Sequence, residues 1–384
     1  MSLKPIEQSF KVSYEYKLHF TKNLFHIDNI IFNTIVDSYG KGRAVKLLFV
    51  IDNGVAQHHP DLANNIELYC QKYEALSLTE ALIVVGGEQS KNDATCVNKV
   101  LTAINKNQIC RHSFVIVIGG GAVIDMVGYA ATIAHRGVKL IRIPTTVLSQ
   151  NDSAVGVKNG VNAFGKKNFI GTFAPPYAIL NDTDFLKTLE QRDWISGVSE
   201  AVKVALIKDR AFFKFLEENA IKIQQRDEDA MQYLIYKCAE IHMHHIAQGG
   251  DPFESGSSRP LDFGHWAAHK MEQMTQYSLR HGEAVAKGIM LDVIYAQLIG
   301  MLSEEVTVRV RTLFEQIGFD LTLPKQVTVN GLMDGIEEFR EHLGGELTIT
   351  LLSKIGEKED VHVIDQLVMK KAMLLLNEYC KQKV

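Results

Sequence analysis

The residues best suited to chemistry are a glutamate and three histidines in the second half of the chain. Glu200 lies within a helical pattern, and His281 stands at the start of another. His265 and His269 are spaced i, i+4, so a helix would carry both imidazoles on one face. A carboxylate with two imidazoles and an open coordination position is typical of a catalytic zinc site. The pattern indicates metal-assisted chemistry, although an HxxxH pair alone is a weak signal.

A second histidine cluster, at residues 242–245, is a weaker candidate for a metal site. On a helix, the imidazoles of His242, His244 and His245 would point in diverging directions. We therefore expect these side chains to have surface or packing roles.

A glycine turn in the first half of the chain has the features of a phosphate site. Residues 114–118 form a continuous apolar run, as buried parallel strands do. Gly119, Gly120 and Gly121 follow, then an apolar-periodic helix and a second strand at residues 139–143. Glycines allow a pyrophosphate to approach the backbone at a helix N-terminus. The spacing GGGxxxD differs from the usual GxGxxG fingerprint, so the turn alone is weak evidence.

Two further apolar runs also end in polar turns. Residues 46–51 are followed by Asp52, and residues 81–85 are followed by two glycines and Glu88. A carboxylate at the carboxyl end of a parallel strand can bind a ribose hydroxyl, whereas turn formation and helix capping are the simpler roles. With helices between these strands, the pattern predicts an α/β fold with a doubly wound, Rossmann-like parallel sheet.

The chain divides by its hydrophobic pattern. Residues 10–20 alternate like an exposed hairpin strand, and residues 29–38 have a helical pattern. Helical patterns dominate after residue 185, so we place a boundary near Leu186, between an α/β domain (1–185) and an all-helical domain (186–384). The helices expected in the second domain are residues 191–208, 210–225, 229–247, 264–272, 282–301, 303–317 and 365–383. Residues 248–260 are the longest non-periodic stretch and therefore a candidate functional loop.

Composition narrows the functional class. The 384 residues are 46% hydrophobic and 22% charged, with a net charge of −4, which gives no basic footprint for nucleic acid. Five cysteines without CxxC spacing favour reduced thiols in a cytoplasmic chain. No signal peptide is recognised, and no apolar run approaches a membrane span, so we expect neither secretion nor membrane insertion.

Ordered motifs along most of the chain resemble the sugar phosphate cyclase superfamily, which includes 3-dehydroquinate synthases and C7-cyclitol synthases such as the 2-epi-5-epi-valiolone and 2-epi-valiolone synthases. The motifs that carry the resemblance are GGEQSK (86–91), GGGAVIDMVGYAA (119–131), RGVKLIRIPTT (136–146), VGVKNGVN (155–162), KNFIG (167–171), SEAVK (199–203), DFGHWAAH (262–269) and HGEAVAKGI (281–289). The resemblance implies the fold described above, a homodimer, and a small sugar phosphate as substrate.

The resemblance also implies specific site residues. The metal, Zn²⁺ or Co²⁺, would be bound by Glu200, His265 and His281, which makes His269 a substrate contact rather than a ligand. NAD would contact Asp52, Glu88, Lys91, Gly120, Gly121, Asp125, Thr145, Thr146, Lys167, Phe185 and Thr188. The implied catalytic residues are Lys203, His269, Asp152 and Lys158, and the implied substrate-binding residues are Arg136, Asn168, Asp262 and Arg340.

The implied reaction is a redox-neutral cyclisation. A substrate hydroxyl is oxidised by NAD, the resulting ketone acidifies the neighbouring C–H, and phosphate is eliminated. The hydride then returns, the ring opens, and an intramolecular aldol reaction closes a carbocycle. Several cationic side chains are needed to hold a phosphate that leaves as a dianion.

The chain departs from the dehydroquinate-forming pattern where that pattern binds a carboxylate. The family's lysine, 21 residues before the first DFGH-type histidine, and its arginine, 7 residues before it, correspond to His244 and Ser258. An asparagine three residues before that histidine corresponds to Asp262, and a lysine near the C-terminus corresponds to Arg340. Two lost cations and one added carboxylate favour a hydroxyl-rich substrate such as sedoheptulose 7-phosphate. The nearby Arg259 is the main objection.

Three alternatives remain open at the level of the sequence. The chain could be a 3-dehydroquinate synthase, or a metal-dependent polyol dehydrogenase that releases NADH. It could also be a non-catalytic scaffold, but the complete set Glu200, His265 and His281 argues against a decayed site.

Overall fold

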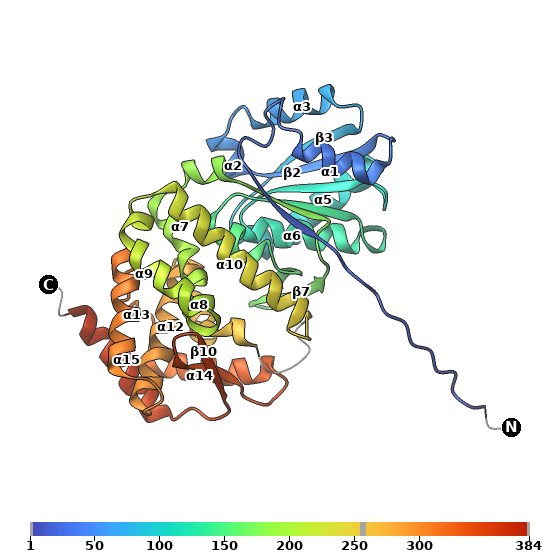
Figure 1. The fold of residues 1–384 in the computed structure, drawn as a ribbon. Helices are drawn as coiled ribbons and strands as arrows, with labels where there is room; N and C mark the ends of the chain where they lie inside the picture. Colours follow the sequence, from blue (N-terminus) through green and yellow to red (C-terminus); the bar gives the residue numbers. More distant parts are fainter. Residues whose placement is uncertain (1–2, 254–258, 382–384) are drawn as a thin grey trace.

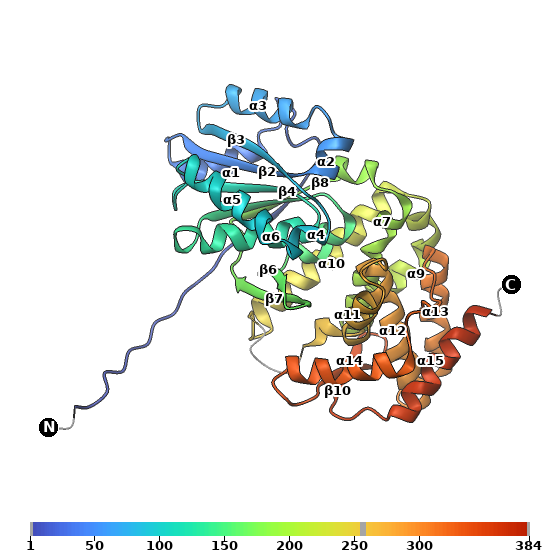
Figure 2. The same ribbon diagram turned by 180° about the vertical axis from the view of Figure 1, so that it is seen from behind.

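The computed structural model describes residues 3–253 and 259–381. An α/β domain and a helical domain lie side by side, as Figures 1 and 2 show from opposite directions. All strand pairs of the main sheet are parallel, which confirms the predicted fold class. In spatial order its strands are β1 (Lys17–Thr21), β8 (Ala178–Asp182), β5 (Lys139–Pro144), β4 (Phe114–Gly119), β2 (Val45–Asp52) and β3 (Leu76–Val84).

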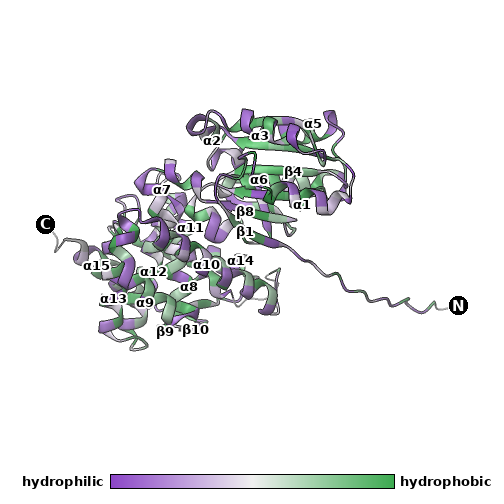
Figure 3. Ribbon diagram, turned by 45° about the horizontal axis from the view of Figure 1, so that its top comes forward, coloured by the Kyte–Doolittle hydropathy of each residue, from purple (hydrophilic) through white to green (hydrophobic). Residues whose placement is uncertain are grey.

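Helices cover both faces of this sheet because its central strands are apolar on both sides. In β4, Val115 and Val117 pack on one face, against the helices α5 and α6. Phe114, Ile116 and Ile118 pack on the other face, against α1 and α3. The hydropathy colouring in Figure 3 shows these strands as a hydrophobic layer inside the domain. The helices of this domain are α1 (Ile31–Gly40), α2 (Asn53–His58), α3 (Leu62–Lys72), α4 (Gln89–Asn92), α5 (Ala94–Lys106) and α6 (Gly121–Ile133).

Connections at the carboxyl edge of the sheet carry most of the candidate site residues. After β5 come the short helical segment η2 (Ser149–Ser153) and a hairpin of β6 (Lys158–Ala163) and β7 (Lys166–Phe173). The pattern analysis did not predict this hairpin. Its turn, Phe164-Gly165, has positive φ at both residues, which is the geometry of a two-residue type I′ turn.

The helical domain packs around the long buried helix α12. Its helices are α7 (Gln191–Ser196), α8 (Val198–Lys208), α9 (Arg210–Gln224), α10 (Glu228–Gln248), α11 (His265–Met274), α12 (His281–Leu298), α13 (Glu304–Ile317), α14 (Val329–His342) and α15 (Gln366–Lys381). One expected helix, residues 191–208, is interrupted at Gly197. Helix α14 and the antiparallel hairpin of β9 (Ile349–Lys354) and β10 (Glu357–Val361) were not predicted. No helix in the described ranges is long and apolar enough to cross a membrane.

The predicted strand at residues 10–20 is only half right. The structure forms a strand from Lys17 to Thr21, and this strand pairs parallel to β8 rather than in a hairpin. Residues 10–16 keep the alternating pattern but have no ladder partner in the described chain.

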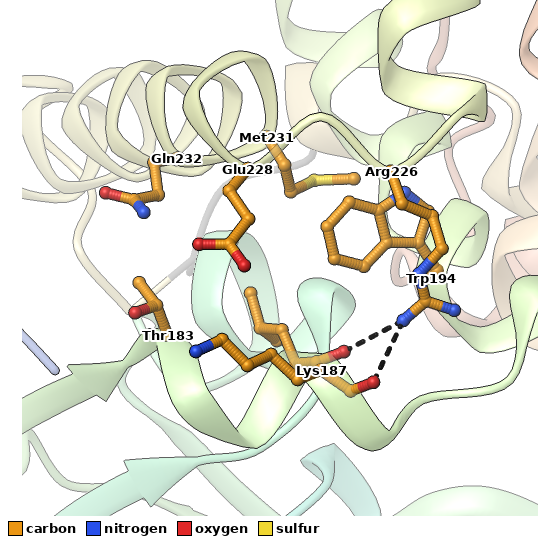
Figure 4. Close-up of a pocket in the computed structure, with 8 residues that line it drawn as sticks. Thr183, Lys187, Trp194, Arg226, Glu228, Met231 and Gln232 are labelled. Carbon is orange, nitrogen blue, oxygen red and sulfur yellow. Dashed lines mark hydrogen bonds between the residues drawn. The ribbon is translucent and has the colours of Figure 1, made fainter. Parts of the chain in front are cut away.

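We propose that the domain boundary lies at residues 185–186, as the sequence pattern suggested. Phe185 packs into the core of the α/β domain, whereas Leu186 belongs to the core of the helical domain. Both lie in the segment η3 (Thr183–Thr188). Figure 4 shows Arg226 beside Trp194, donating to the carbonyls of Leu186 and Lys187 in the same segment. A cavity of about 200 Å³ opens here, and none of the predicted site residues lines it.

Candidate active site

Three candidate metal ligands from three helices converge on one point. Glu200 lies in α8, and His265 and His281 are the first residues of α11 and α12. Glu200 Oε1 is 3.6 Å from His265 Nε2 and 3.4 Å from His281 Nε2. One potential ligand atom of each residue lies within 4.8 Å of the others. The structure thus brings together the set that the motif resemblance implied.

Both imidazoles are oriented by a partner on their other ring nitrogen. His265 Nδ1 is 3.1 Å from the carbonyl oxygen of Phe263, and His281 Nδ1 is 3.2 Å from Oε2 of Glu272. A proton on each Nδ1 would be donated to these oxygens, which leaves both Nε2 lone pairs directed at Glu200. Metal-binding histidines in proteins are usually held in this way.

The turn before α11 explains how His265 is held in place. Gly264 has φ +76°, and a Cβ there would lie 2.7 Å from the backbone nitrogen of Ile289 in α12. Glycine therefore allows both the left-handed turn and the close crossing of the two helices. Buried Asp292 accepts from the Gly264 N–H and from Trp266 Nε1, each at 2.9 Å.

The charge balance of this site fits a bound cation. Glu200 is fully buried, and neither of its carboxylate oxygens accepts a well-directed hydrogen bond from a described residue. Lys203 Nζ lies 2.5 Å from Oε2 of Glu200. Among the described residues, the neighbours of Oε1 in such pairs are His265 and His281. Burial alone would lower the pKa of His281, but Glu272 and Glu200 outweigh it and raise the pKa to about 9. A carboxylate this deeply buried requires compensating charge. A divalent cation held by Oε1 of Glu200 and Nε2 of His265 and His281 would supply it.

A second, overlapping group is less suited to bind a metal. The ligand atoms of His269, Glu272 and His281 also lie within 4.8 Å of one another. However, Glu272 is already engaged by Lys167 Nζ at 2.8 Å and by Nδ1 of His281. Its carboxylate therefore orients His281 rather than binding a metal itself. The HxxxH pair, His265 and His269, is not the chelate in this geometry.

His242, for which we expected a surface or packing role, contacts one of the predicted catalytic residues. Its Nδ1 lies 3.1 Å from Oδ1 of Asp152, which is in η2. Burial and Glu200 would raise the pKa of Asp152, but Lys203 and His242 outweigh them and lower it. The signal was present in the sequence, because His242 is three and four residues after the buried Ala239 and Cys238 of α10.

Several ionisable side chains act on Asp262, the residue that replaces the family's asparagine. Burial would raise the pKa of its carboxyl, but Lys158, His265, His269 and Lys203 together lower it. The ring of His269 lies 5.5 Å from that of His265 between centroids. Three of the predicted catalytic residues, Lys158, Lys203 and His269, are therefore electrostatic neighbours of one carboxylate.

The glycine turn and Asp52 meet at the carboxyl edge of the sheet. Gly120 caps α6, and a Cβ on Gly121 would lie 2.5 Å from Oγ of Ser153, so the backbone can approach closely only with glycine. The open N-terminus of this 13-residue helix can accept a pyrophosphate. Asp52 accepts from the N–H of Gly54 at 2.8 Å and caps α2. The capping role considered for Asp52 is therefore present, whether or not its carboxylate also reaches a ribose.

Two polar pairs join the sheet edge to the β6–β7 hairpin. Lys91 is buried, and its Nζ lies 2.7 Å from Oδ2 of Asp125 and donates to the side chain of Asn168 in β7. Glu88 Oε1 accepts from Nδ2 of Asn162 in β6 at 2.8 Å. Four of the predicted cofactor and substrate residues therefore form one hydrogen-bonded edge.

The remaining predicted cofactor residues hold the backbone of this edge. The Thr145 N–H donates to the carbonyl oxygen of Gly119 at 3.1 Å, and the Thr146 N–H donates to Oγ of Ser149 at 3.0 Å. Phe185 is buried in the core, and Thr188 Oγ1 lies 3.0 Å from Nε2 of His59. In the described chain these residues therefore have contacts that hold the backbone of the sheet edge in place.

Two predicted substrate residues, Arg136 and Arg340, have no hydrogen bond or ion pair with another predicted site residue in the described chain. Arg136 is exposed at the far end of α6, and a helix of 13 residues places it about 20 Å from the glycine turn. Arg340 in α14 is partly exposed and pairs with Glu337 on its own helix at 3.1 Å. No other described residue forms an ion pair with it.

The positions assigned to the family's carboxylate-binding residues are described only in part. His244 is exposed on α10, so the imidazole that faces the site from this helix is that of His242. Ser258 lies outside the described residues. Arg259 is half-buried beside them.

Arg142, which the sequence analysis passed over, holds the loop that carries Asp152 and Lys158. It is fully buried on β5, where burial lowers its pKa to about 10. Its guanidinium donates to the carbonyls of Ala154, Gly156 and Lys158 and to Oδ1 of Asn159, at 2.6 to 3.2 Å.

Replacing Arg142 with methionine should lower the free energy of unfolding substantially. Each buried acceptor left without a donor costs roughly 1–3 kcal/mol, so we expect a total loss of several kcal/mol. Urea unfolding of Arg142→Met and Arg309→Met measures this. Arg309 has a bidentate pair with Glu217 at the partly exposed surface, and its loss should cost less than about 1 kcal/mol. Equal losses in the two variants would contradict the role assigned to Arg142.

With this geometry established, comparisons with known proteins define the class of the chain. Two family models match it, described as 3-dehydroquinate synthase N-terminal over residues 81–196 and 3-dehydroquinate synthase C-terminal over residues 197–338. A 3-dehydroquinate synthase of Aliivibrio fischeri is 36% identical over 77% of this chain and 80% of its own length. A 3-dehydroquinate synthase of Vibrio atlanticus is 35% identical over 79% of this chain and 82% of its own length.

The chain belongs to the 3-dehydroquinate synthase family and is a sugar phosphate cyclase of that family, an enzyme of the phosphate-eliminating lyase type. Among solved structures, it is similar to a 2-epi-5-epi-valiolone synthase from Streptomyces hygroscopicus subsp. jinggangensis 5008 with NAD⁺ and Zn²⁺ bound. The TM-score is 0.87, with 25% identity over 98% of this chain and 99% of that one. A 2-deoxy-scyllo-inosose synthase complexed with carbaglucose-6-phosphate, NAD⁺ and Co²⁺ shares the fold, with a TM-score of 0.77, 22% identity and coverages of 93% and 96%.

Proposed function

We propose that this enzyme converts sedoheptulose 7-phosphate, or a ketose phosphate like it, into a cyclitol with release of phosphate. The observation that carries the proposal is the presence of two carboxylates, Asp152 and Asp262, among the predicted site residues. Helix α10 presents His242, which is engaged by Asp152, and the loop before α11 presents Asp262. Carboxylates at these two places accept hydrogen bonds from hydroxyl groups and repel a substrate carboxylate.

We further propose NAD and a divalent metal, Zn²⁺ or Co²⁺, as cofactors. Glu200, His265 and His281 would hold the metal, and the glycine turn with Asp52, Glu88 and Lys91 would hold NAD. When bound, the two cofactors supply reversible hydride transfer and polarisation of the substrate oxygen. The valiolone synthase solved with NAD⁺ and Zn²⁺ supports this pairing.

The side chains of this chain would perform the remaining tasks. Lys158 can bind the phosphate and its charge as it leaves, and His269, whose pKa burial lowers to about 3, can donate a hydrogen bond to it as a neutral imidazole. Lys203 stays protonated because Glu200 and Asp152 outweigh the effect of burial and raise its pKa. Asn168 on β7 is fixed by Lys91 at the boundary between the cofactor edge and the substrate.

The experiment that tests this proposal compares two substrates under identical conditions. Phosphate release is measured from sedoheptulose 7-phosphate and from the carboxylate-bearing heptulosonate phosphate used by 3-dehydroquinate synthases. We expect release from the first and little from the second, without build-up of NADH. NADH formation matched to substrate consumption would indicate a polyol dehydrogenase instead.

Substitution of Asp262 tests the same proposal from the side of the enzyme. Asp262→Ala removes a hydrogen-bond acceptor and should reduce kcat/KM for the ketose phosphate by roughly 1–3 kcal/mol of transition-state stabilisation. Asp262→Asn keeps an acceptor and is the matched control, with a smaller loss. If both variants gained activity on the carboxylate substrate and lost none on the ketose, Asp262 would not read hydroxyl groups.

A second candidate is 3-dehydroquinate synthase itself. The curated relatives of that name, at 35–36% identity, favour it, and the half-buried Arg259 supplies a cation near Asp262 in the sequence. Efficient conversion of the heptulosonate phosphate into dehydroquinate in the assay above would decide for this function.

We make two further proposals, on the cellular compartment and on the oligomeric state. The described cysteines Cys70, Cys96, Cys110 and Cys238 are free thiols, which supports a reducing compartment such as the cytoplasm. We also propose a homodimer, and the N-terminal segment indicates how it forms.

A further inference from the structure

The N-terminal segment of residues 3–15, called the arm from here on, runs away from the body of the molecule (Figures 1 and 2). Every residue in it is exposed. Its one hydrogen-bonding, ionic or ring contact with the described chain is between Tyr14 and Phe253, whose ring centroids are 6.1 Å apart. Tyr16 ends the arm, and its hydroxyl donates to the carbonyl of Val155 at 3.1 Å.

The arm has the sequence of a β-strand with one buried face. Phe10, Val12 and Tyr14 alternate with Lys11, Ser13 and Glu15, and the alternation continues through β1. Phe10 is 87% exposed and Val12 is 62% exposed. Such a strand normally pairs and buries its apolar side, because an unpaired apolar strand invites association. In the described part of its own chain this strand has no ladder partner.

The hairpin β6–β7 offers a matching surface. It is a two-stranded sheet, so the outer edge of β7 lacks a ladder partner in the described chain. Phe164 at the turn is 84% exposed, and Phe169 and Phe173 on one face of β7 are about half exposed. Phe173 also lies 5.4 Å from Phe253, the ring that Tyr14 contacts. The arm therefore leaves the molecule next to this aromatic surface without covering it.

We propose that two copies of this chain exchange arms, each arm adding as a strand to the β6–β7 hairpin of the other copy. Both halves of the contact are present on one chain, so a two-fold arrangement satisfies them reciprocally and closes the assembly. Residues 10–16 are also close in length to the eight residues of β7. The alignment with the valiolone synthase covers 98% of this chain, and the remainder is shorter than the arm, so part of the arm has an aligned counterpart there.

The exchange has a consequence for the site. Strand β7 carries Lys167, which engages Glu272, and Asn168, which is engaged by Lys91. A partner strand on β7 would restrain these residues from their exposed side. The contact between copies does not depend on which ketose phosphate the enzyme uses, so its test is independent of the substrate assay.

Inter-copy disulfide trapping tests the exchange directly. Val12→Cys and Phe169→Cys are made in separate Cys110→Ser chains, because Cys110 is an exposed thiol. After mixing and mild oxidation, we expect a disulfide-linked species that contains one copy of each variant. Ser38→Cys, exposed on α1, replaces Val12→Cys as the control and should not cross-link. Absence of the mixed species, or cross-linking within one chain that carries both cysteines, overturns the proposal.

The oligomeric state gives a second, independent measurement. Light scattering across a dilution series should show that the parent is a dimer. Its dissociation constant should rise at least about tenfold after deletion of residues 2–14 or in Phe10→Asp/Val12→Asp, since both changes remove apolar burial. Lys11→Ala/Ser13→Ala changes the opposite side of the strand and should leave the dimer unchanged. The arm makes almost no contact within its own chain, so circular dichroism of each variant should match the parent. A parent monomer, or a dimer unaffected by the deletion, overturns the exchange.

Discussion

Glu200→Gln should abolish turnover and leave the purified protein without bound metal. Glutamine keeps the shape of the side chain but removes the negative charge that faces two Nε2 atoms and Lys203. Removing one partner of a buried ion pair costs roughly 3–5 kcal/mol, or about 100- to 5,000-fold in affinity. Elemental analysis gives the metal content, and phosphate release gives the activity.

Two controls isolate the metal from the fold. Glu217→Gln removes a carboxylate that pairs with Arg309 at 2.8 Å outside the site and should keep both metal and activity. Prolonged dialysis of the parent against a chelator should also abolish turnover, and Zn²⁺ or Co²⁺ should restore it. A Glu200→Gln protein that retains one equivalent of metal and full activity would exclude Glu200 as a ligand.

Sequence reasoning located the α/β framework because its signals are local. The run at residues 114–118 is apolar at every position, and only a strand covered on both faces buries all of them. The glycines after it appear where α6 begins. The helical domain was harder, since α14 and the β9–β10 hairpin have short or mixed patterns, and their packing on the rest of the domain decides their conformation.

The candidate ligand set is a different case, because spacing alone would have selected another pair of histidines. His265 and His269 are one helical turn apart, yet the geometry directs His265 and His281 at Glu200. That choice depends on how α8, α11 and α12 cross, which no local pattern encodes. The resemblance to the family supplied the choice of ligands, because its motifs occur in the same order along this chain.

The site residues that the sequence pattern did not identify are those that hold other functional groups in position. His242, Arg142 and Glu272 each contact a candidate functional group or the loop that carries one. Nothing marks such residues in a single sequence except helix periodicity, and this periodicity was available for two of them. Glu272 is seven residues after His265 and therefore on the same face of α11. Arg142 shows no such signal, because a strand interior predicts an apolar residue there.

Glu272→Gln should weaken metal binding by about 10–100-fold while the fold persists. The carboxylate accepts from Nδ1 of His281 with one oxygen and from Lys167 Nζ with the other, at 3.2 and 2.8 Å. An amide has one accepting oxygen, so either His281 or Lys167 would face the NH₂ group instead. We expect His281 to lose its fixed orientation and the metal to dissociate more readily.

Competition with a chromogenic chelator measures the metal affinity of Glu272→Gln against that of Lys167→Met. The second variant removes the other partner of the same carboxylate and leaves the bond to His281, so its metal affinity should stay within a few-fold of the parent. Its defect should instead appear in the KM for NAD, because Lys167 lies beside the cofactor edge. Equal metal affinity in parent and Glu272→Gln would show that His281 is oriented without Glu272, since the positions of α11 and α12 alone would then suffice to hold the imidazole.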